Sequence, residues 1–507
     1  MYKFLIIYFT KIFFVTIFSI ASCFYLLLVT KNYDLGLSHD SVSYLEETRK
    51  INCRLKRNSD SCQQLETHRP PGYPFFLSLT SSISQTKPIV AAKILNIVSL
   101  IVIIWFFNKL LARFDWSNRQ IFFLNLFLIS SHSFRIFLMV WSEPLFIAFL
   151  LISLHLFFSW IGSKKVQLLA TTGILTGLMF IIRYAAVGFI LGFCINIILF
   201  RQNIFKKITN LAIFVTNMAV IPIAWIIFTQ LSNLATTNRQ LRFHLFSANH
   251  LKSLVKTIKK WILPLPQPTF ISQKTYFFIL MAMALLIAAI FLKRKNRQQL
   301  LLHFKSILSV KNKKQFPLTV LMASYLLFIL FSISLIDFHT PLNYRILAPL
   351  FPLFLILLGK TFFLNKLVFY LILVSYLAQG FFLFNSFFYE GSGYSGKVFK
   401  ESEVLAKVQA NQDCKIVTNG VDLVSYYKPE CNHIMSLPAK LRPTSQKKNP
   451  NYQQELSKIK LQIEKNEYQL VYFDKISWRY YYPTSTELKN YFSGHKITRL
   501  EDGFIVK

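Results

Sequence analysis

The sequence has little charge for its length. Only 16% of its 507 residues are Asp, Glu, Lys or Arg, whereas a soluble protein of this size carries about 25%. Hydrophobic residues make up 53% of the chain, and the mean hydropathy is +0.42. Apolar runs of about 20 residues recur, and this is the length that crosses a ~30 Å hydrocarbon core. These features argue against a soluble chain and predict a polytopic membrane protein.

Several catalytic signatures are absent. The chain contains no G-x-x-x-x-G-K-[ST], H-E-x-x-H or G-x-S-x-G sequence, which argues against nucleotide hydrolysis and zinc proteolysis. Charged residues are not strung along the interiors of the apolar runs, as an ion or proton path would need. The runs are far longer than the ~10-residue alternating strands of a membrane barrel, so the spans are expected to be helices.

Acidic residues are scarce beside basic ones. The chain has 22 Asp and Glu against 57 Lys and Arg, a net charge of +35. Many of the cations lie in short loops between apolar runs, which fits orientation by the positive-inside rule and contact with anionic headgroups. Membrane lipids are therefore the expected partner of this charge, and nucleic acid is not.

The apolar runs predict about eleven transmembrane helices in a multi-pass protein of the cytoplasmic (plasma) membrane. The first run, Phe4–Val29, is too long for a cleavable signal peptide and is expected to be a retained signal-anchor. Alternation of loop charge places the N-terminus inside and two long loops, residues 31–87 and 231–274, outside. The remaining runs are expected at residues 89–111, 121–139, 144–160, 166–182, 184–200, 208–230, 276–292, 316–336, 346–358 and 367–388.

The chain after residue 388 has a different composition. Glycine and serine between residues 391 and 396 indicate a flexible link. Residues 415–419 and 469–473 are expected to be strands, with a helix at 454–465 between them. We therefore divide the chain into a transmembrane module, residues 1–388, and a small extracytoplasmic α/β domain, residues 389–507, which is a usual domain size.

The six cysteines suggest an oxidising compartment for the outer parts. Cys53 and Cys62 share the first outer loop, and Cys414 and Cys431 share the tail. Even numbers of outer cysteines are typical of disulfides. Free thiols remain the alternative, and the lack of a Cys-x-x-Cys pair disfavours a metal site.

A few polar residues at the outer ends of spans could carry chemistry. Asp40, just after the first span, could act as a general base or ligate a divalent cation, or it could be a helix cap. Glu143 lies on the same side, where it could instead only stabilise a helix start. Arg69, Arg183 and Arg345 could hold phosphate oxygens through their guanidinium forks, or contact lipid headgroups.

These segments together resemble the GT-C superfamily of polytopic glycosyltransferases, in particular bacterial members related to protein mannosyltransferases and the aminoarabinose transferase of lipid A. The resemblance covers the eleven spans and extends to the tail, and the order and sidedness of the motifs carry it. The similar segments are His39-Asp40, His68-Arg69-Pro70-Pro71-Gly72-Tyr73-Pro74, Ser142-Glu143-Pro144-Leu145-Phe146, Ile182-Arg183-Tyr184-Ala185 and Tyr344-Arg345-Ile346-Leu347-Ala348-Pro349.

The resemblance implies roles for individual residues. Asp40 and Glu143 would be the catalytic acids, with Asp40 as the general base or acceptor-orienting group. Residues for the donor phosphate would be Arg345, Arg183, Arg69 and His68, supported by His39, Tyr73 and His339. The first loop lacks an Asp-Asp or Asp-x-Asp pair. A metal site is therefore open: Mg²⁺ or Mn²⁺ would use Asp40 and Glu143 if such an ion binds.

The expected function is that of a membrane hexosyltransferase. It would move a sugar from a polyprenyl-phosphate donor to a lipid, glycan or protein acceptor at the outer membrane face, by an inverting displacement. A transporter or flippase of a lipid-linked glycan, without covalent chemistry, is the alternative, and it would need broken helices and polar groups near the midplane. A third possibility is a non-catalytic assembly protein whose tail binds a partner.

Overall fold

The structure is a computed structural model that falls into two compact units. Unit 1 comprises Met1–Lys31 and Glu47–Ser386, and unit 2 comprises Asn32–Glu46 and Phe387–Lys507. The structure describes residues 2–56, 69–200, 202–231, 243–244, 246–266, 294–309, 312, 314–336, 340–411, 414–431, 433–441, 448–476 and 481–507. We had assigned the whole first outer loop to the transmembrane module, but its first part, Asn32–Glu46, belongs to the unit that contains the tail.

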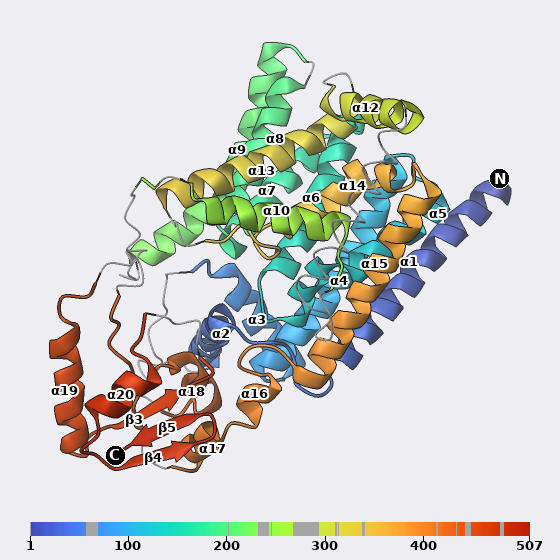
Figure 1. The fold of residues 1–507 in the computed structure, drawn as a ribbon. Helices are drawn as coiled ribbons and strands as arrows, with labels where there is room; N and C mark the ends of the chain where they lie inside the picture. Colours follow the sequence, from blue (N-terminus) through green and yellow to red (C-terminus); the bar gives the residue numbers. More distant parts are fainter. Residues whose placement is uncertain are drawn as a thin grey trace. The chain divides into compact units, whose positions relative to one another are not determined.

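Unit 1 is built from helices (Figure 1). They are α1 (Tyr2–Val29), α3 (Gly72–Ser84), α4 (Pro88–Arg113), α5 (Asn118–Ser130), the 3₁₀ helix η1 (His132–Leu138), α6 (Glu143–Ser163), α7 (Val166–Ile182), α8 (Ala186–Leu199), α9 (Ile204–Leu231), α10 (Ala248–Ile262), α12 (Arg294–Leu308), α13 (Gln315–Leu335), α14 (Leu350–Phe362) and α15 (Lys366–Asn385). Helix α2 (His39–Lys56) begins in unit 2 and ends in unit 1.

The described helices support a multi-pass membrane protein. Five are long and apolar enough to cross a membrane: α4, α6, α9, α13, and α15 with its continuation to Glu390. A sixth arises if the bent pair α5–η1 is one span. Four shorter apolar helices, Phe13–Val29, α7, α8 and α14, coincide with further predicted runs. Within the described residues, the helices that are both long and apolar enough are therefore fewer than the eleven predicted. The run at residues 276–292 lies outside the described residues.

The bend in the third predicted span has a local cause. Ser131 adopts an extended conformation, with ψ of 158°, and this ends α5. Its side chain then accepts a hydrogen bond from the backbone N–H of Phe134 and caps η1. The two helices meet at a 60° bend. His132, the first residue of η1 after the break, is buried.

The polar stretch before the second span is more helical than the sequence suggested. The prolines of Arg69–Pro74 favour a break in helical structure, with a helix only from Phe75 onward. Instead α3 begins at Gly72, because Pro74 lies in its first turn, where the missing proline N–H has no helical partner to lose. Ser38 and Ser41 exchange hydrogen bonds at the start of α2.

Unit 2 contains a five-stranded sheet flanked by helices (Figure 1). Its elements are the π-helical turn η2 (Ser386–Glu390), which begins at the last residue of unit 1, α16 (Lys397–Lys400), α17 (Glu403–Ala410), β1 (Lys415–Thr418), α18 (Val421–Tyr427), β2 (His433–Ser436), α19 (Tyr452–Glu464), β3 (Gln469–Phe473), α20 (Ser485–Tyr491), β4 (Ile497–Leu500) and β5 (Gly503–Val506). The strand order is β2-β1-β3-β5-β4. Strands β2, β1 and β3 are parallel, and β5 and β4 add an antiparallel hairpin that the sequence analysis missed.

Apolar side chains of α19 hold it on this sheet. Leu456, Ile459 and Ile463 lie at helical spacing and are buried against Leu470 and Phe504 of the sheet. At about 25 cal/mol per Å² of apolar surface, each buried side chain of this size stabilises the unit by roughly 1.5–3 kcal/mol. The opposite side of α19 stays exposed and polar, so this helix presents one face to the core and another to solvent.

The segment Asn32–Glu46 is tied to the rest of unit 2 by backbone contacts. Leu37 exchanges hydrogen bonds with Ser392 and Tyr394, and Ser395 donates to the carbonyl oxygen of Leu35. Gly393 permits this approach: its φ is +62°, and a Cβ there would lie 1.8 Å from the Leu37 oxygen. The supposed flexible link at residues 391–396 therefore anchors the first outer segment.

Cys414 and Cys431, which we paired from the sequence, form a disulfide with a Cα–Cα distance of 4.8 Å. They precede the neighbouring strands β1 and β2, so the bond joins the amino ends of two parallel strands. Cys62 lies outside the described residues, and Cys23 and Cys194 are free thiols.

Candidate active site

A buried carboxylate organises the polar interior of unit 1. Glu143 is the first residue of α6, and its side chain is 1% exposed. Its Oε1 lies 2.5 Å from the Nε of Arg345 and also pairs with Arg183. Arg183 donates a further hydrogen bond to the hydroxyl of Ser142 at 3.2 Å. The structure thus brings together three residues that the sequence analysis had placed only on a common membrane side.

The secondary structure explains how these residues reach one point. The N-terminus of α6 favours a negative side chain through the helix dipole. Arg183 follows the end of α7 directly, and Arg345 precedes α14. The Glu143 Oε2 atom is buried and has no hydrogen-bond partner in the described part of the chain. One carboxylate against two guanidinium groups leaves this triad with a net charge of +1.

Aromatic side chains extend the triad. The Arg345 guanidinium lies 4.4 Å from the centre of the Trp141 ring, a cation–π distance. The Trp141 ring lies 6.4 Å from that of Tyr344. Burial raises the pKa of the Tyr344 hydroxyl, so the group stays protonated at neutral pH and can donate a hydrogen bond.

Three residues that the sequence analysis did not select complete this cluster. The His132 ring lies 4.5 Å from the Tyr344 ring, and its Nε2 is 3.2 Å from the Nζ of Lys260. The Arg135 guanidinium lies over the Tyr344 ring, 5.9 Å from its centre. Burial, together with the charges of Lys256 and Arg135, lowers the pKa of Lys260 to about 8.

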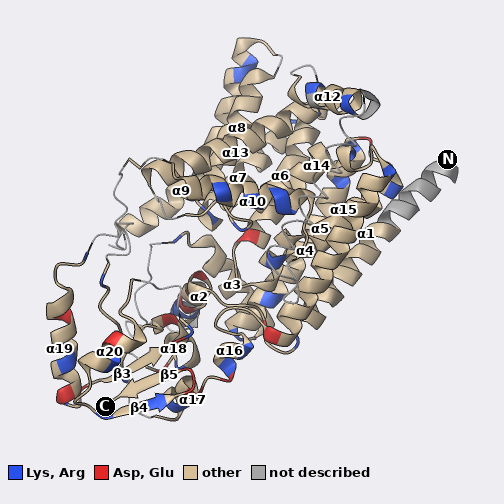
Figure 2. Cartoon of the chain, in the orientation of Figure 1, with Lys and Arg blue, Asp and Glu red and all other residues tan. Residues whose placement is uncertain are grey.

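The sequence held signals for these missed residues. Arg135 is a cation inside the apolar run 121–139, and such a residue is a functional candidate by default. Lys252, Lys256 and Lys260 recur every four residues, which places them on one side of α10. Such a basic amphipathic pattern is typical of a helix that lies on the membrane surface. In Figure 2, basic residues mark α10 and α12, while the helices around them are largely uncharged.

An apolar cavity of about 360 Å³ adjoins the charged cluster. It is lined by α10, α12, α13, α14 and the turn before α14, and Trp261, Ile258 and Phe354 are among its residues. Trp261 follows Lys260 in the chain, and its indole N–H donates to Ser133 of η1 at 3.2 Å. The consecutive residues Lys260 and Trp261 of α10 therefore belong to the charged cluster and to the lining of the apolar cavity, respectively.

The Arg69–Pro74 segment approaches the end of α7. A Cβ on Gly72 would lie 2.8 Å from the carbonyl oxygen of Ile181, so only glycine allows this contact. Arg183 is two residues further along. Tyr73 is fully buried and Arg69 is partly buried. The glycine thus holds the start of α3 against the turn that carries Arg183.

The other predicted residues lie in unit 2 or outside the described residues. Asp40 is partly buried in the first turn of α2, where the helix dipole favours a carboxylate. His39 is largely exposed, and its Nδ1 lies 2.9 Å from Asp422 of α18. His68 and His339 lie outside the described residues.

The residues around Glu143 do not form a divalent-cation site by themselves. Mg²⁺ and Mn²⁺ prefer several oxygen ligands, whereas Glu143 supplies one carboxylate that two guanidinium groups already neutralise. Within the described residues, no group of three or more His, Cys, Asp or Glu side chains is placed to hold a metal.

The whole chain is similar to solved membrane-protein structures. It matches ArnT from Cupriavidus metallidurans bound to undecaprenyl phosphate with a TM-score of 0.57 and 11% identity, over 97% of each chain. The apo form of the same protein matches with a TM-score of 0.55, also at 11% identity and over 97% of each chain. The chain has the same fold as ArnT.

The two ArnT matches confirm the fold that the resemblance implied. The archaeal oligosaccharyltransferase AglB from Archaeoglobus fulgidus, in complex with an inhibitory peptide and a dolichol-phosphate, matches with a TM-score of 0.48 and 8% identity, over 92% of this chain and 70% of its own. Neither a protein-family model nor a curated protein sequence matches the chain.

Proposed function

We propose that this chain is a membrane glycosyltransferase that moves a sugar from a polyprenyl-phosphate donor to a lipid, glycan or protein acceptor. The observation that carries the proposal is the junction at Lys260 and Trp261 of α10. On one side lies a cluster with excess positive charge, and on the other lies a wholly apolar cavity. A lipid phosphate has the matching chemistry, an anionic head on a hydrocarbon chain. The ArnT structure with the same fold contains such a lipid.

The charges of the cluster suit a phosphate. Lys260 and Arg135 add two positive charges to the net +1 of the Glu143 triad. Because the cluster is partly buried, these charges act in a lower dielectric than water and are worth more to a bound anion. Glu143 then orients Arg183 and Arg345 rather than acting on the substrate itself, a role that differs from the catalytic one first assigned to it.

The proposed reaction is a direct displacement at the anomeric carbon. The bond from that carbon to the phosphate oxygen breaks, and a bond to the acceptor oxygen or nitrogen forms, with inversion. The acceptor proton passes to a general base, for which Asp40 is the candidate by resemblance. Negative charge grows on the departing lipid phosphate, and the cations stabilise it there. The outer membrane face is the proposed side, from the charge of the loops.

A test uses membranes that contain the full chain and a radiolabelled polyprenyl-phosphate sugar. Mass spectrometry of envelope lipids, glycans and proteins from cells with and without the gene product identifies the acceptor. Sugar transfer that is lost in Asp40→Asn at normal expression supports the proposal, and undiminished transfer contradicts the role of Asp40.

The transporter alternative now has one observation in its favour, the broken α5–η1 span with its buried His132. Broken spans with polar groups occur at transporter binding sites. The two functions differ in their products, because a transporter moves a labelled lipid across reconstituted vesicles without forming a new covalent bond. Such movement with no product would overturn the glycosyltransferase proposal.

A further inference from the structure

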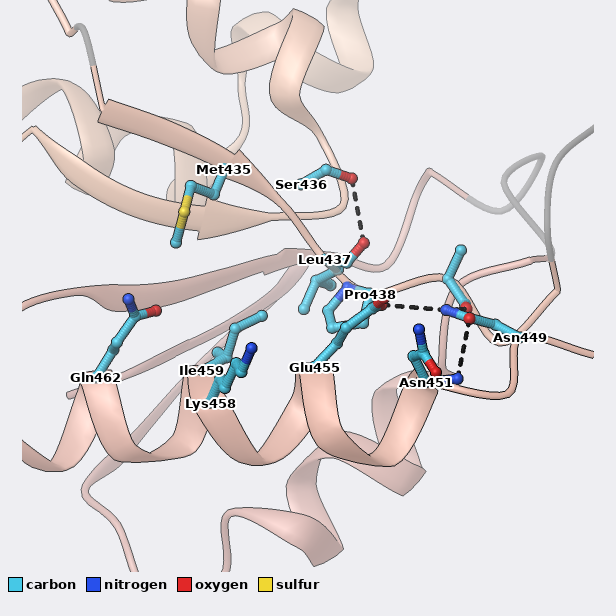
Figure 3. A pocket seen from close by; sticks show the side chains of 11 residues that line it. Met435, Ser436, Leu437, Pro438, Asn449, Asn451, Glu455, Lys458, Ile459 and Gln462 are labelled. Atoms are coloured by element: carbon cyan, nitrogen blue, oxygen red, sulfur yellow. Dashed lines mark hydrogen bonds between the residues drawn. The ribbon is translucent and has the colours of Figure 1, made fainter.

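Unit 2 contains a cavity that the reaction above does not use. It has a volume of about 620 Å³, within the ~300–1,000 Å³ range of small-molecule sites. It lies between the carboxyl end of β2, the turn that follows this strand, and α19 (Figure 3). In open sheets with parallel strands, ligands bind beyond the carboxyl ends of those strands. The position is therefore that of a ligand site in an α/β domain.

The two walls of the cavity differ in chemistry. Met435, Leu437 and Pro438 provide an apolar wall at the end of β2, together with Ile459 of α19. From α19 and its first turn, polar side chains reach toward the same space: Asn451, Glu455, Lys458 and Gln462 (Figure 3). Residues 451, 455, 458 and 462 are spaced by three or four, so they form one stripe along the helix.

The polar stripe contains one hydrogen-bonded carboxylate and three further polar side chains. Asn449 donates hydrogen bonds to Glu455 Oε2 at 3.1 Å and to the carbonyl oxygen of Ala439 at 3.0 Å. This holds the carboxylate of Glu455 at the mouth of the cavity. For Asn451, Lys458 and Gln462, by contrast, the described structure gives no side-chain hydrogen bond or ion pair. Their donors and acceptors are thus open to a ligand.

Charge and composition define the ligand class. Glu455 and Lys458 cancel, so the lining has no net charge to attract an anion. Its residues include no aromatic ring on which a nucleobase could stack. What remains is a row of mixed donors and acceptors facing an apolar wall, which matches hydroxyl groups on one edge of a pyranose and C–H groups on its face. We infer that this cavity binds an uncharged glycan.

This binding site is separate from the transfer reaction, because it is formed by unit 2 alone and needs no lipid-linked donor. Its test is therefore independent of the proposed activity. Failure of glycan binding leaves the transferase proposal untouched, and failure of transfer leaves this one untouched.

The experiment uses the full chain in phosphatidylcholine nanodiscs, since maltoside detergents carry a sugar that would compete. The probes are neutral trisaccharides of hexose, N-acetylhexosamine and deoxyhexose, with trigalacturonate as the anionic counterpart, and saturation-transfer NMR measures binding. The variants are Glu455→Gln and Gln462→Ala, and Gln454→Ala, on the same helix but outside the cavity, is the matched control.

We expect at least one neutral trisaccharide to bind, with affinity about tenfold weaker in each cavity variant and unchanged in the control. Unchanged melting curves show that the variants remain folded. Three results overturn the inference: no neutral trisaccharide binds, binding is equal in all variants, or trigalacturonate binds as well as the neutral probes. If an extended peptide that pairs along β2 displaces the bound saccharide, the glycan inference is overturned and a protein partner is favoured.

Discussion

Replacing Glu143 with glutamine tests whether the buried triad is structural. Glutamine keeps the shape of the side chain but removes the charge that neutralises Arg183 and Arg345. Breaking a buried ion pair in this way costs about 3–5 kcal/mol, since the remaining charges are left uncompensated. The two arginine side chains are 13% and 17% exposed, so some solvation persists and the lower end, about 3 kcal/mol, is expected. That is roughly a hundredfold shift in the unfolding equilibrium.

Arg345→Gln should cost less than Glu143→Gln, because the carboxylate keeps its pairing with Arg183. The loss of stability in the double variant should be smaller than the sum of the two single losses by about 0.5–3 kcal/mol, the range for residues in one network. Unfolding in mixed detergent–SDS micelles, followed by tryptophan fluorescence, measures each free energy. Asp115→Asn is the matched control, because its ion pair with Lys314 is exposed, at 76% and 55%, and exposed pairs contribute little.

A Glu143→Gln variant as stable as the parent chain would contradict a stabilising role of the triad, and so would losses of stability in the two single variants that simply add. A stable but inactive Glu143→Gln variant would instead restore the catalytic role that the sequence analysis gave to this residue.

Other predictions concern the transfer reaction. Since Lys260 has a pKa lowered to about 8, it loses its charge as pH rises through that value, and the KM for the lipid-linked donor should rise between pH 7 and 9. Lys260→Arg should remove this pH dependence, and a KM that is flat in the parent chain contradicts the assignment. Asp40→Asn should abolish transfer with the KM for donor little changed, whereas a general loss of expression would point to a structural role. Gly72→Ala should reduce activity and thermal stability because its Cβ meets the Ile181 backbone, while Gly162→Ala, with open space around it, should not. Dialysis against EDTA should leave transfer intact if no divalent cation is needed, and restoration by Mg²⁺ or Mn²⁺ after a loss would establish a metal site.

Much of the membrane architecture could be predicted from the sequence. Apolar length is a local property, so the runs at 89–111, 166–182 and 316–336 reappear as α4, α7 and α13 with ends shifted by two residues or fewer. The break at Ser131 was missed because hydropathy averages over a window and does not detect a single extended residue.

The small domain was predicted less completely. Strands β1 and β3 contain β-branched and aromatic residues in succession and were found, whereas β2, β4 and β5 were not. Strands β2 and β4 mix polar and apolar residues, and such a pattern is ambiguous over four residues. The attachment of Asn32–Glu46 to this unit depends on backbone pairing between Leu37 and the Gly393 region, more than 350 residues apart. No local pattern in the chain encodes such a pairing.

The sequence by itself determined the class of the protein, its helical spans and the types of residue available for chemistry, because hydrophobic length and residue type are readable locally. Only the tertiary structure decided which residues act together. It placed Arg183 and Arg345 on one oxygen of Glu143, joined Lys260 and Arg135 to His132 and Tyr344, and opened the cavity beside α19. Each of these depends on packing between elements far apart in the chain, where charge compensation and close contact, not sequence spacing, select the partners.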